Sequence, residues 1–150
     1  MLNLLLLLST VTFLGTASGA MGNSRDTSTY ANIDEVYATH MDLDFAVDFD
    51  NQLLKGHVII TFNTSAENVN SVWLDAEGMY VTNVEYGLGN NFHPVAFFMT
   101  RPNNNLGNAV EVELPQINPV GTTFMLKVSY FTNDQTTAIS WLQPSQTAGG

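Results

Sequence analysis

The sequence predicts an all-β protein folded as an antiparallel β-sandwich. Three observations lead to this prediction. Residues 40–50 alternate apolar and acidic side chains with a period of two, short runs of the same kind recur along the chain, and turn signals separate these runs every eight to twelve residues. No stretch keeps the 3.6-residue period of an amphipathic helix.

Residues 40–50 are predicted to form the first strand. One side of it would carry the apolar residues and the other side the acidic residues: Leu43, Phe45, Val47 and Phe49 against Asp42, Asp44, Asp48 and Asp50. Asp50, Asn51 and Gln52 have turn chemistry, and residues 53–63 alternate again. We therefore expect a long hairpin whose apolar face is buried by a second sheet.

The rest of the chain supplies further strand-like runs. They are residues 69–74, 80–86, 95–99, 110–114 and 122–131, followed by a short apolar run at 138–142. Trp73 and Trp141 both lie inside apolar runs, so we expect them in the sandwich core rather than on a ligand-binding surface.

The bulk composition excludes several classes of protein. A chain of 150 residues, 45% hydrophobic and 12% charged, is long enough for one domain with a substantial core. Its formal charge of −10 makes nucleic acid and anionic membrane surfaces poor partners and indicates a solvated acidic surface. Because the sequence contains no cysteine, it has no disulfide, thiol nucleophile or thiolate metal site.

The first twenty residues are predicted to be a secretory signal peptide. They carry no charged side chain, and their leucine-rich run fades into small residues, with cleavage expected after Ala20 or Gly19. The segment also lacks the usual Lys or Arg near its start, and an uncleaved anchor is the alternative. We expect a secreted protein with a polar lead-in at residues 21–33 and the sandwich at 34–150. Asn63 begins an Asn-Thr-Ser triplet and is a candidate glycosylation site.

Residues that could carry chemistry are scarce. His40, His57 and His93 lack the spacing of a zinc motif, although His40 and His57 could meet on paired strands as a zinc site; surface histidines are the favoured interpretation. The four aspartates of the first strand could share calcium, but a flat strand does not curl around an ion, which favours a solvated face. The sequence contains no nucleophile elbow or phosphate loop, so we assign no catalytic and no metal-binding residue.

Two groups of residues resemble a known family. The first group is Leu43–Phe49, Leu54-Lys55-Gly56, Ile60-Thr61-Phe62, Val72–Asp75 and Val81–Val84. Their order is similar to the N-terminal domain of the gluzincin zinc aminopeptidases, a saddle-like β-sandwich. The second group runs from Ala138 to Gly149 and contains Trp141-Leu142-Gln143-Pro144-Ser145-Gln146-Thr147-Ala148-Gly149; it resembles the branch of leukotriene A4 hydrolase and aminopeptidase B.

This resemblance implies a hydrolase whose reactive parts lie outside the chain. In the family, zinc and the His-Glu-x-x-His motif belong to a catalytic domain that follows the sandwich, so none of the family's catalytic residues maps onto this sequence. Zinc is implied for the full-length family, and the catalytic domain is the implied partner of this sandwich.

Two functions of different class follow. The chain is expected to be the scaffold domain of a secreted zinc aminopeptidase, truncated before its catalytic domain and inactive alone. Such a domain would expose an apolar patch where the rest of the enzyme docks. The alternative is a stand-alone secreted β-sandwich that binds a partner and exposes no large apolar patch.

Overall fold

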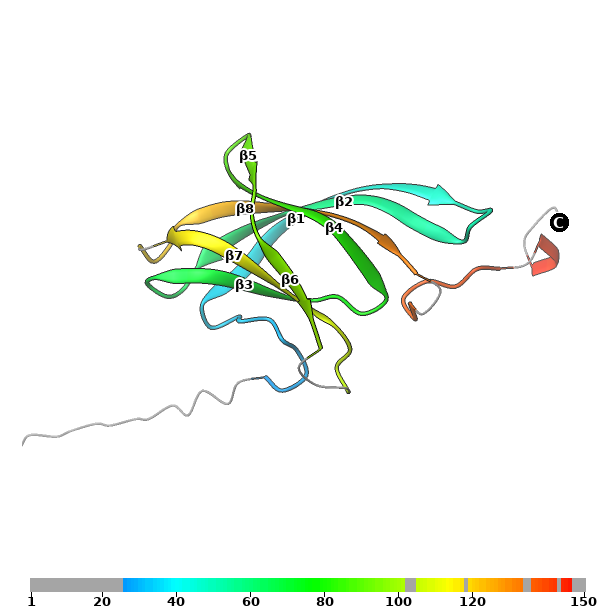
Figure 1. The fold of residues 1–150 in the computed structure, drawn as a ribbon, viewed down its shortest axis with the longest axis horizontal. Coiled ribbons are helices and arrows are strands. Elements are labelled where there is room, and N and C mark those ends of the chain that lie inside the picture. The colour runs from blue at the N-terminus through cyan, green and yellow to red at the C-terminus, as the bar shows by residue number, and fades with distance from the viewer. Residues whose placement is uncertain (1–25, 102–104, 118, 134–135, 143, 147–150) are drawn as a thin grey trace, which may run out of the picture.

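The structure is a computed structural model that describes residues 26–101, 105–117, 119–133, 136–142 and 144–146. Two antiparallel sheets face each other (Figure 1). The large sheet has the order β1-β2-β8-β4-β5, from β1 (Val36–Asp48), β2 (Leu53–Thr64), β4 (Met79–Leu88), β5 (Asn91–Pro94) and β8 (Thr123–Thr132). The small sheet has the order β3-β7-β6, from β3 (Val69–Asp75), β6 (Phe97–Thr100) and β7 (Ala109–Ile117). The prediction of an antiparallel β-sandwich is confirmed.

The core fills the space between the two sheets. Alternate residues of the central strands point into it: Val58, Ile60 and Phe62 from β2, Phe124, Leu126 and Val128 from β8, Val84 from β4, Val72 from β3, and Val110, Val112 and Leu114 from β7. Three aromatic rings pack together in it: Phe124 stacks on Phe62 with ring centroids 5.4 Å apart and lies beside Tyr86 at 5.7 Å. This period-two burial is the pattern that the alternation predicted.

The two sheets differ in width, and this difference leaves part of the large sheet uncovered. The small sheet lies over β8, β4 and part of β2, whereas the β1–β2 hairpin extends beyond it (Figure 1). The first strand was predicted to have a buried apolar side, and this prediction is wrong for most of its length. Leu43 is 63% exposed and Val47 is 49% exposed, because β1 is an edge strand and no described strand reaches over it.

The prediction of one short strand at residues 95–99 is only partly correct: residues 97–99 lie in β6, whereas β5 precedes the predicted segment. β5 pairs with β4 in the large sheet, and β6 pairs with β7 in the small sheet. The chain crosses between the sheets at Val95 and Ala96, whose backbone hydrogen-bonds to Val84 at 3.0 Å and to Glu113 at 2.9 Å. Pro94 marks this point, since proline cannot donate to a continuing strand ladder.

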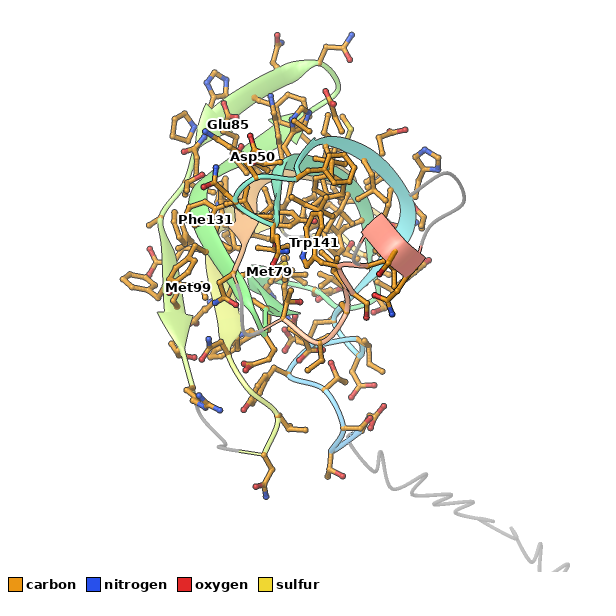
Figure 2. All side chains as sticks on the ribbon, turned by 90° about the vertical axis from the view of Figure 1, so that its right-hand side faces the viewer. Asp50, Met79, Glu85, Met99, Phe131 and Trp141 are labelled. Carbon is orange, nitrogen blue, oxygen red and sulfur yellow. The ribbon has the colours of Figure 1, made fainter. Side chains whose placement is uncertain are left out.

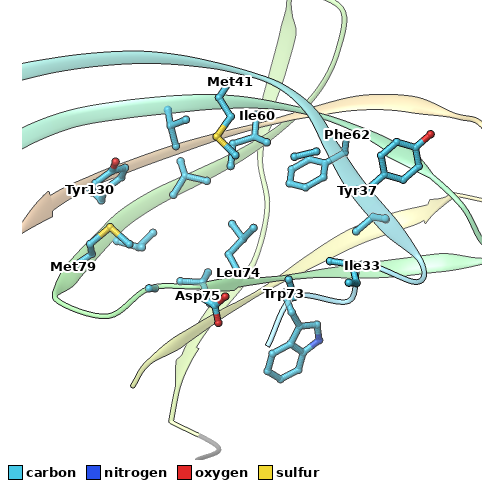
Figure 3. A pocket seen from close by; sticks show the side chains of 18 residues that line it. Ile33, Tyr37, Met41, Ile60, Phe62, Trp73, Leu74, Asp75, Met79 and Tyr130 are labelled. Carbon is cyan, nitrogen blue, oxygen red and sulfur yellow. The ribbon is translucent and has the colours of Figure 1, made fainter. Parts of the chain in front are cut away.

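The two tryptophans are not in the core, which corrects their predicted position. Trp73 is half-buried and points away from the inter-sheet space (Figure 3). Trp141 lies in the irregular segment after β8, where its ring meets Phe49 edge-on at 5.9 Å, and the apolar run at 138–142 forms no strand. A short apolar run therefore indicates contact with the protein surface as readily as burial.

The turn between β1 and β2 is held by a carboxylate. Asp48 accepts hydrogen bonds from the backbone N–H of Asn51 at 2.9 Å and from its side-chain amide at 2.8 Å. These bonds, with the side-chain bond the larger cause, hold the pKa of Asp48 below its ordinary value of 3.8. A carboxylate with a lowered pKa adds stability above its unfolded-state pKa, and this stability is lost as the pH falls through the folded-state pKa.

We expect Asn51→Ala to raise the pKa of Asp48 toward its ordinary value, because the side-chain hydrogen bond is removed. A carbonyl-detected NMR titration of Asp48 between pH 2 and 6 measures this shift. Asp44 on the same strand serves as the internal reference. An unchanged Asp48 titration in the variant would contradict the assignment of Asn51 as the cause.

The described part of the lead-in is tied to β3. The Asn32 side chain accepts a hydrogen bond from the backbone N–H of Trp73 at 3.0 Å and donates one to the backbone carbonyl of Ser71 at 3.1 Å. At the end of β3, the Asp75 carboxylate accepts hydrogen bonds from the Thr29 hydroxyl at 2.5 Å and from the backbone N–H of Tyr30 at 2.9 Å. The predicted signal peptide lies outside the described residues, and within them no helix is long and apolar enough to span a membrane.

Asn32→Ala is expected to lower the free energy of unfolding by about 1–3 kcal/mol, because it removes the side-chain amide that bonds the backbone N–H of Trp73 and the backbone carbonyl of Ser71. Urea unfolding followed by circular dichroism measures the change. Asn70→Ala, at an exposed position of β3, is the matched control and should change stability by less than about 0.5 kcal/mol. Equal effects of both variants would show that the Asn32 bonds contribute nothing.

Candidate functional site

The strongest functional feature is the uncovered inner side of β1. Met41, Leu43, Phe45 and Val47 alternate along this strand and share the side of the sheet that carries the core residues of β2. We call these four residues the open face. Met41 is 55% exposed, and its neighbours Leu43 and Val47 are exposed to a similar degree. Side chains of this size normally lie inside a sandwich, so the open face is an apolar surface without a described cover.

A cavity lies beside the open face, between the large sheet and β3 (Figure 3). Its volume is about 540 Å³, and six of its lining residues are Met41, Ile60, Phe62, Leu74, Met79 and Tyr130. The space opens to solvent along one side, so it is an apolar groove beside the core and not a closed void. The cavity and the open face meet at Met41 and form one continuous apolar surface.

The cavity lining carries little charge. None of its described residues is Lys, Arg or His, and its one carboxylate, Asp75, is already bound by Thr29 and Tyr30 of the lead-in. Burial raises the pKa of the Tyr130 hydroxyl, so this group stays neutral at physiological pH. A surface of this kind can bury apolar side chains but offers no group that would hold an anion.

Close packing of β1 on β2 keeps the open face in place. Gly56 of β2 lies between Phe45 of β1 and Tyr130 of β8 in the strand register. The two aromatic rings meet edge-on above it, with centroids 5.4 Å apart. A Cβ atom at Gly56 would overlap the carbonyl oxygen of Asp44, so only glycine permits this approach of the two strands. This glycine therefore fixes β1 and the direction in which the open face points.

The acidic side chains lie on the opposite side of the same strand. Asp42, Asp44 and Asp48 alternate with the open-face residues and are directed to the outer side of the sheet. His40 Nε2 lies 3.2 Å from Asp42 Oδ1 on this exposed side. β1 is thus apolar on one side and acidic on the other.

The residues considered for a metal site do not come together. In the β1–β2 register, His40 pairs with Thr61 and His57 pairs with Asp44, which places the two histidines four residues apart along the strands, or about 13 Å. Zinc requires ligands at about 2.0–2.3 Å, so this pair does not fit it. In the described part of the chain, no three His, Asp or Glu side chains form a group that could hold a metal ion.

The candidate glycosylation residue Asn63 lies near the end of β2, as the sequence predicted, and is half-buried. Its side-chain oxygen is buried and makes no hydrogen bond to the residues that the structure describes. Glycosylation at Asn63 remains a prediction.

Sequence reasoning identified Leu43, Phe45 and Val47 of the open face but placed them in the core, and it did not single out Met41. Their alternation gives the side of the strand on which they lie, but alternation does not say whether a second sheet reaches that side. The signal that could have helped is the density of aspartate on the opposite side, since charged residues are typical of edge strands.

Comparison with known proteins identifies the class to which this fold is related. No protein-family model matches the chain. Leucine aminopeptidase 2 of Yarrowia lipolytica is 30% identical over 129 residues, which are 85% of this chain and 19% of that enzyme. The chain therefore spans about a fifth of the length of such relatives.

Solved structures agree on the fold. The native leukotriene A4 hydrolase of Saccharomyces cerevisiae superposes with a TM-score of 0.73 at 23% identity, over 87% of this chain and 20% of that one. An M1 zinc metallopeptidase of Deinococcus radiodurans, bound to a Tyr-Ser-Ala substrate, superposes with a TM-score of 0.52 at 25% identity, over 66% of this chain and 21% of that one.

The fold and these relatives define the class: the chain is related to the N-terminal β-sandwich of the M1 zinc aminopeptidases. Within that class, its relatives are leucine aminopeptidase 2 and leukotriene A4 hydrolase, the branch that the resemblance implied.

Proposed function

We propose that the chain is the scaffold domain of a secreted zinc aminopeptidase, and that its open face packs against the remainder of the enzyme. The observation that carries this proposal is the uncovered apolar surface formed by the open face and the adjoining cavity. The relatives are about five times as long as the chain, so they contain ample polypeptide to cover it. The domain would position the catalytic domain and wall one side of its cleft.

The zinc chemistry of such an enzyme would be supplied elsewhere. In zinc peptidases the metal polarises a bound water for attack on the peptide bond. The described residues of this chain include no set of ligands for that metal. The role of these residues is therefore binding and orientation: the apolar side of β1 contacts the catalytic part, while its acidic side faces solvent.

Secretion is part of the proposal and is supported by the uncharged, leucine-rich start of the sequence. The alternative of a stand-alone binding module is less well supported, because a monomeric module is expected to expose no large apolar patch, whereas β1 exposes one.

A chimeric enzyme tests the proposal. This chain would replace the matching segment of leucine aminopeptidase 2 of Yarrowia lipolytica, and release of leucine from a chromogenic leucine amide would be measured. We expect a soluble, active chimera whose activity falls at least tenfold with Val47→Glu, because that change buries a charge in the interface. Ala46→Glu adds the same charge to the acidic side of the same strand and should leave activity within twofold.

A soluble chimera that is equally active with Val47→Glu and with Ala46→Glu would contradict the proposed role of the open face. If no version of the chimera is active, the two variants are compared by soluble yield. They are also compared by copurification of this chain with the remaining segment of leucine aminopeptidase 2, expressed as a separate chain. Equal copurification of both variants would again contradict the proposal.

The chain by itself is expected to have no aminopeptidase activity. The described residues provide no cluster of His, Asp or Glu that could hold zinc. Incubation of the purified chain with leucine amide, with and without added zinc, measures this. Zinc-dependent release of leucine that is abolished by a chelator would overturn the prediction.

A further inference from the structure

The edge of β1 and the open face are the two surfaces through which copies of this chain could meet. β1 ends the large sheet, so one side of its backbone has no strand partner among the described residues. Unprotected edges of this kind lead to strand pairing between molecules unless charge or shape prevents it. The two surfaces therefore need to be compared.

Charge disfavours association through the edge. A two-fold antiparallel pairing of β1 with itself, centred on Phe45, would place Asp42 opposite Asp48 of the second copy on the acidic side of the joined sheet. Like charges directly opposite each other destabilise a strand pair. The chain carries a formal charge of −10, so few basic groups are available to relieve this repulsion. Repulsion between these aspartates therefore disfavours pairing of two β1 edges.

No such charge repulsion opposes contact between two open faces. Its residues are uncharged, and the carboxylates of the same strand point to the other side of the sheet. Two copies that meet by their open faces therefore keep both rows of aspartate in water. Ile33, just before β1, is 51% exposed and extends the apolar surface beside the cavity.

The area is suited to a stable dimer. Together with Ile33, the open face presents on the order of 500 Å² of exposed apolar area, at the upper end of what single soluble domains usually show. A standard interface buries about 800 Å² on each partner, of which roughly 60% is apolar. An apolar contribution near 500 Å² matches this requirement.

The shape of the chain also allows a two-fold contact. Each copy has a projecting β1–β2 hairpin and, directly beside it, the cavity of about 540 Å³ (Figures 1 and 3). A two-fold axis places the hairpin of each copy over the cavity of the other, since an isologous interface repeats every contact. Apolar side chains of one copy would then fill the apolar groove of its partner.

We propose that the chain on its own forms a two-fold homodimer through the open face. This inference goes beyond the proposed scaffold function but uses the same surface, so in a complete enzyme the dimer contact would be replaced by the catalytic part. Self-association would protect the apolar face of the chain whenever that part is absent.

Sedimentation velocity of the purified chain between 1 and 100 µM tests the proposal. We expect a concentration-dependent change from one to two copies, weakened at least tenfold by Val47→Glu and less than twofold by Ala46→Glu. Circular dichroism of each variant verifies that both remain folded. A chain that is monomeric throughout this range, or that forms polydisperse aggregates instead of a dimer, would overturn the proposal. So would equal weakening by the two variants.

Cysteine variants provide a second measurement that does not depend on added charge. The natural sequence contains no cysteine, so Val47→Cys and Ala46→Cys each introduce a single thiol. A short bismaleimide should link Val47→Cys into a dimer and leave Ala46→Cys unlinked. Linking of Ala46→Cys in preference to Val47→Cys would indicate association through the acidic side. If the chain fails these dimer tests while the chimera is active, the homodimer is excluded and the scaffold function stands. If the chain dimerises as predicted while the chimera does not respond to Val47→Glu, the scaffold function is excluded and the homodimer stands.

Discussion

Phe124→Ala is expected to lower the free energy of unfolding by about 3–5 kcal/mol, the usual cost of removing a buried aromatic side chain. Phe124 is 1% exposed and contacts two other rings, Phe62 and Tyr86. The free energy of unfolding of a domain is about 5–15 kcal/mol in total, so this single change removes a large part of it. The cavity left behind would join the space that already exists between the sheets.

Urea unfolding monitored by circular dichroism measures this loss. Phe98→Ala is the matched control, because Phe98 of β6 is 50% exposed and should contribute less than about 1 kcal/mol. If Phe124→Ala costs no more than Phe98→Ala, the three rings are not the centre of the core.

Gly56→Ala is expected to destabilise the chain by about 3 kcal/mol or more, and to act on β1 in particular. The added methyl group would overlap the Asp44 carbonyl oxygen, which forces β1 away from β2. Since β1 has β2 as its sheet neighbour, this displacement removes its hydrogen-bonded partner. The open face would then lose the orientation that the proposed function requires.

Hydrogen exchange measured by mass spectrometry separates this local effect from general unfolding. We expect exchange of the amides in β1 to rise by at least an order of magnitude, with a smaller change in β7. Gly89→Asn is the control, because a side chain there meets nothing within 4 Å and asparagine tolerates the positive φ of 62°. Uniform exchange across both sheets in Gly56→Ala would contradict the local account.

Much of the fold could be predicted from the sequence because strand alternation is a local property. The patterns at residues 53–63, 110–114 and 122–131 correspond to β2, β7 and β8, the central strands that supply most of the core. The two predicted strands whose sides differ in charge, the first strand and residues 110–114, were placed correctly along the chain.

What could not be predicted was which strands the second sheet covers. β1 and β2 have equally apolar inner sides, yet Val58 of β2 is 7% exposed and its register partner Leu43 of β1 is 63% exposed. This difference arises from the width of the small sheet, which depends on how β3, β6 and β7 pair over long sequence separations. The division of residues 91–100 between the two sheets is another long-range property of this kind.

The central claim, that the open face is the surface that packs against the rest of an aminopeptidase, predicts a change in the accessibility of one side chain. Met41, in the open face, is 55% exposed, and Met99, on the outer strand of the small sheet and away from Met79 and Trp141 (Figure 2), is 40% exposed. The two methionines should therefore oxidise at similar rates in the dilute isolated chain.

Peroxide oxidation followed by peptide mass spectrometry, performed on the dilute chain and on the chimeric enzyme, is the most direct test. We expect Met41 to oxidise at least fivefold more slowly in the chimera, while the rate at Met99 changes less than twofold. Equal oxidation of Met41 in both proteins would contradict the central claim, because the open face would then remain in solvent when the rest of the enzyme is present.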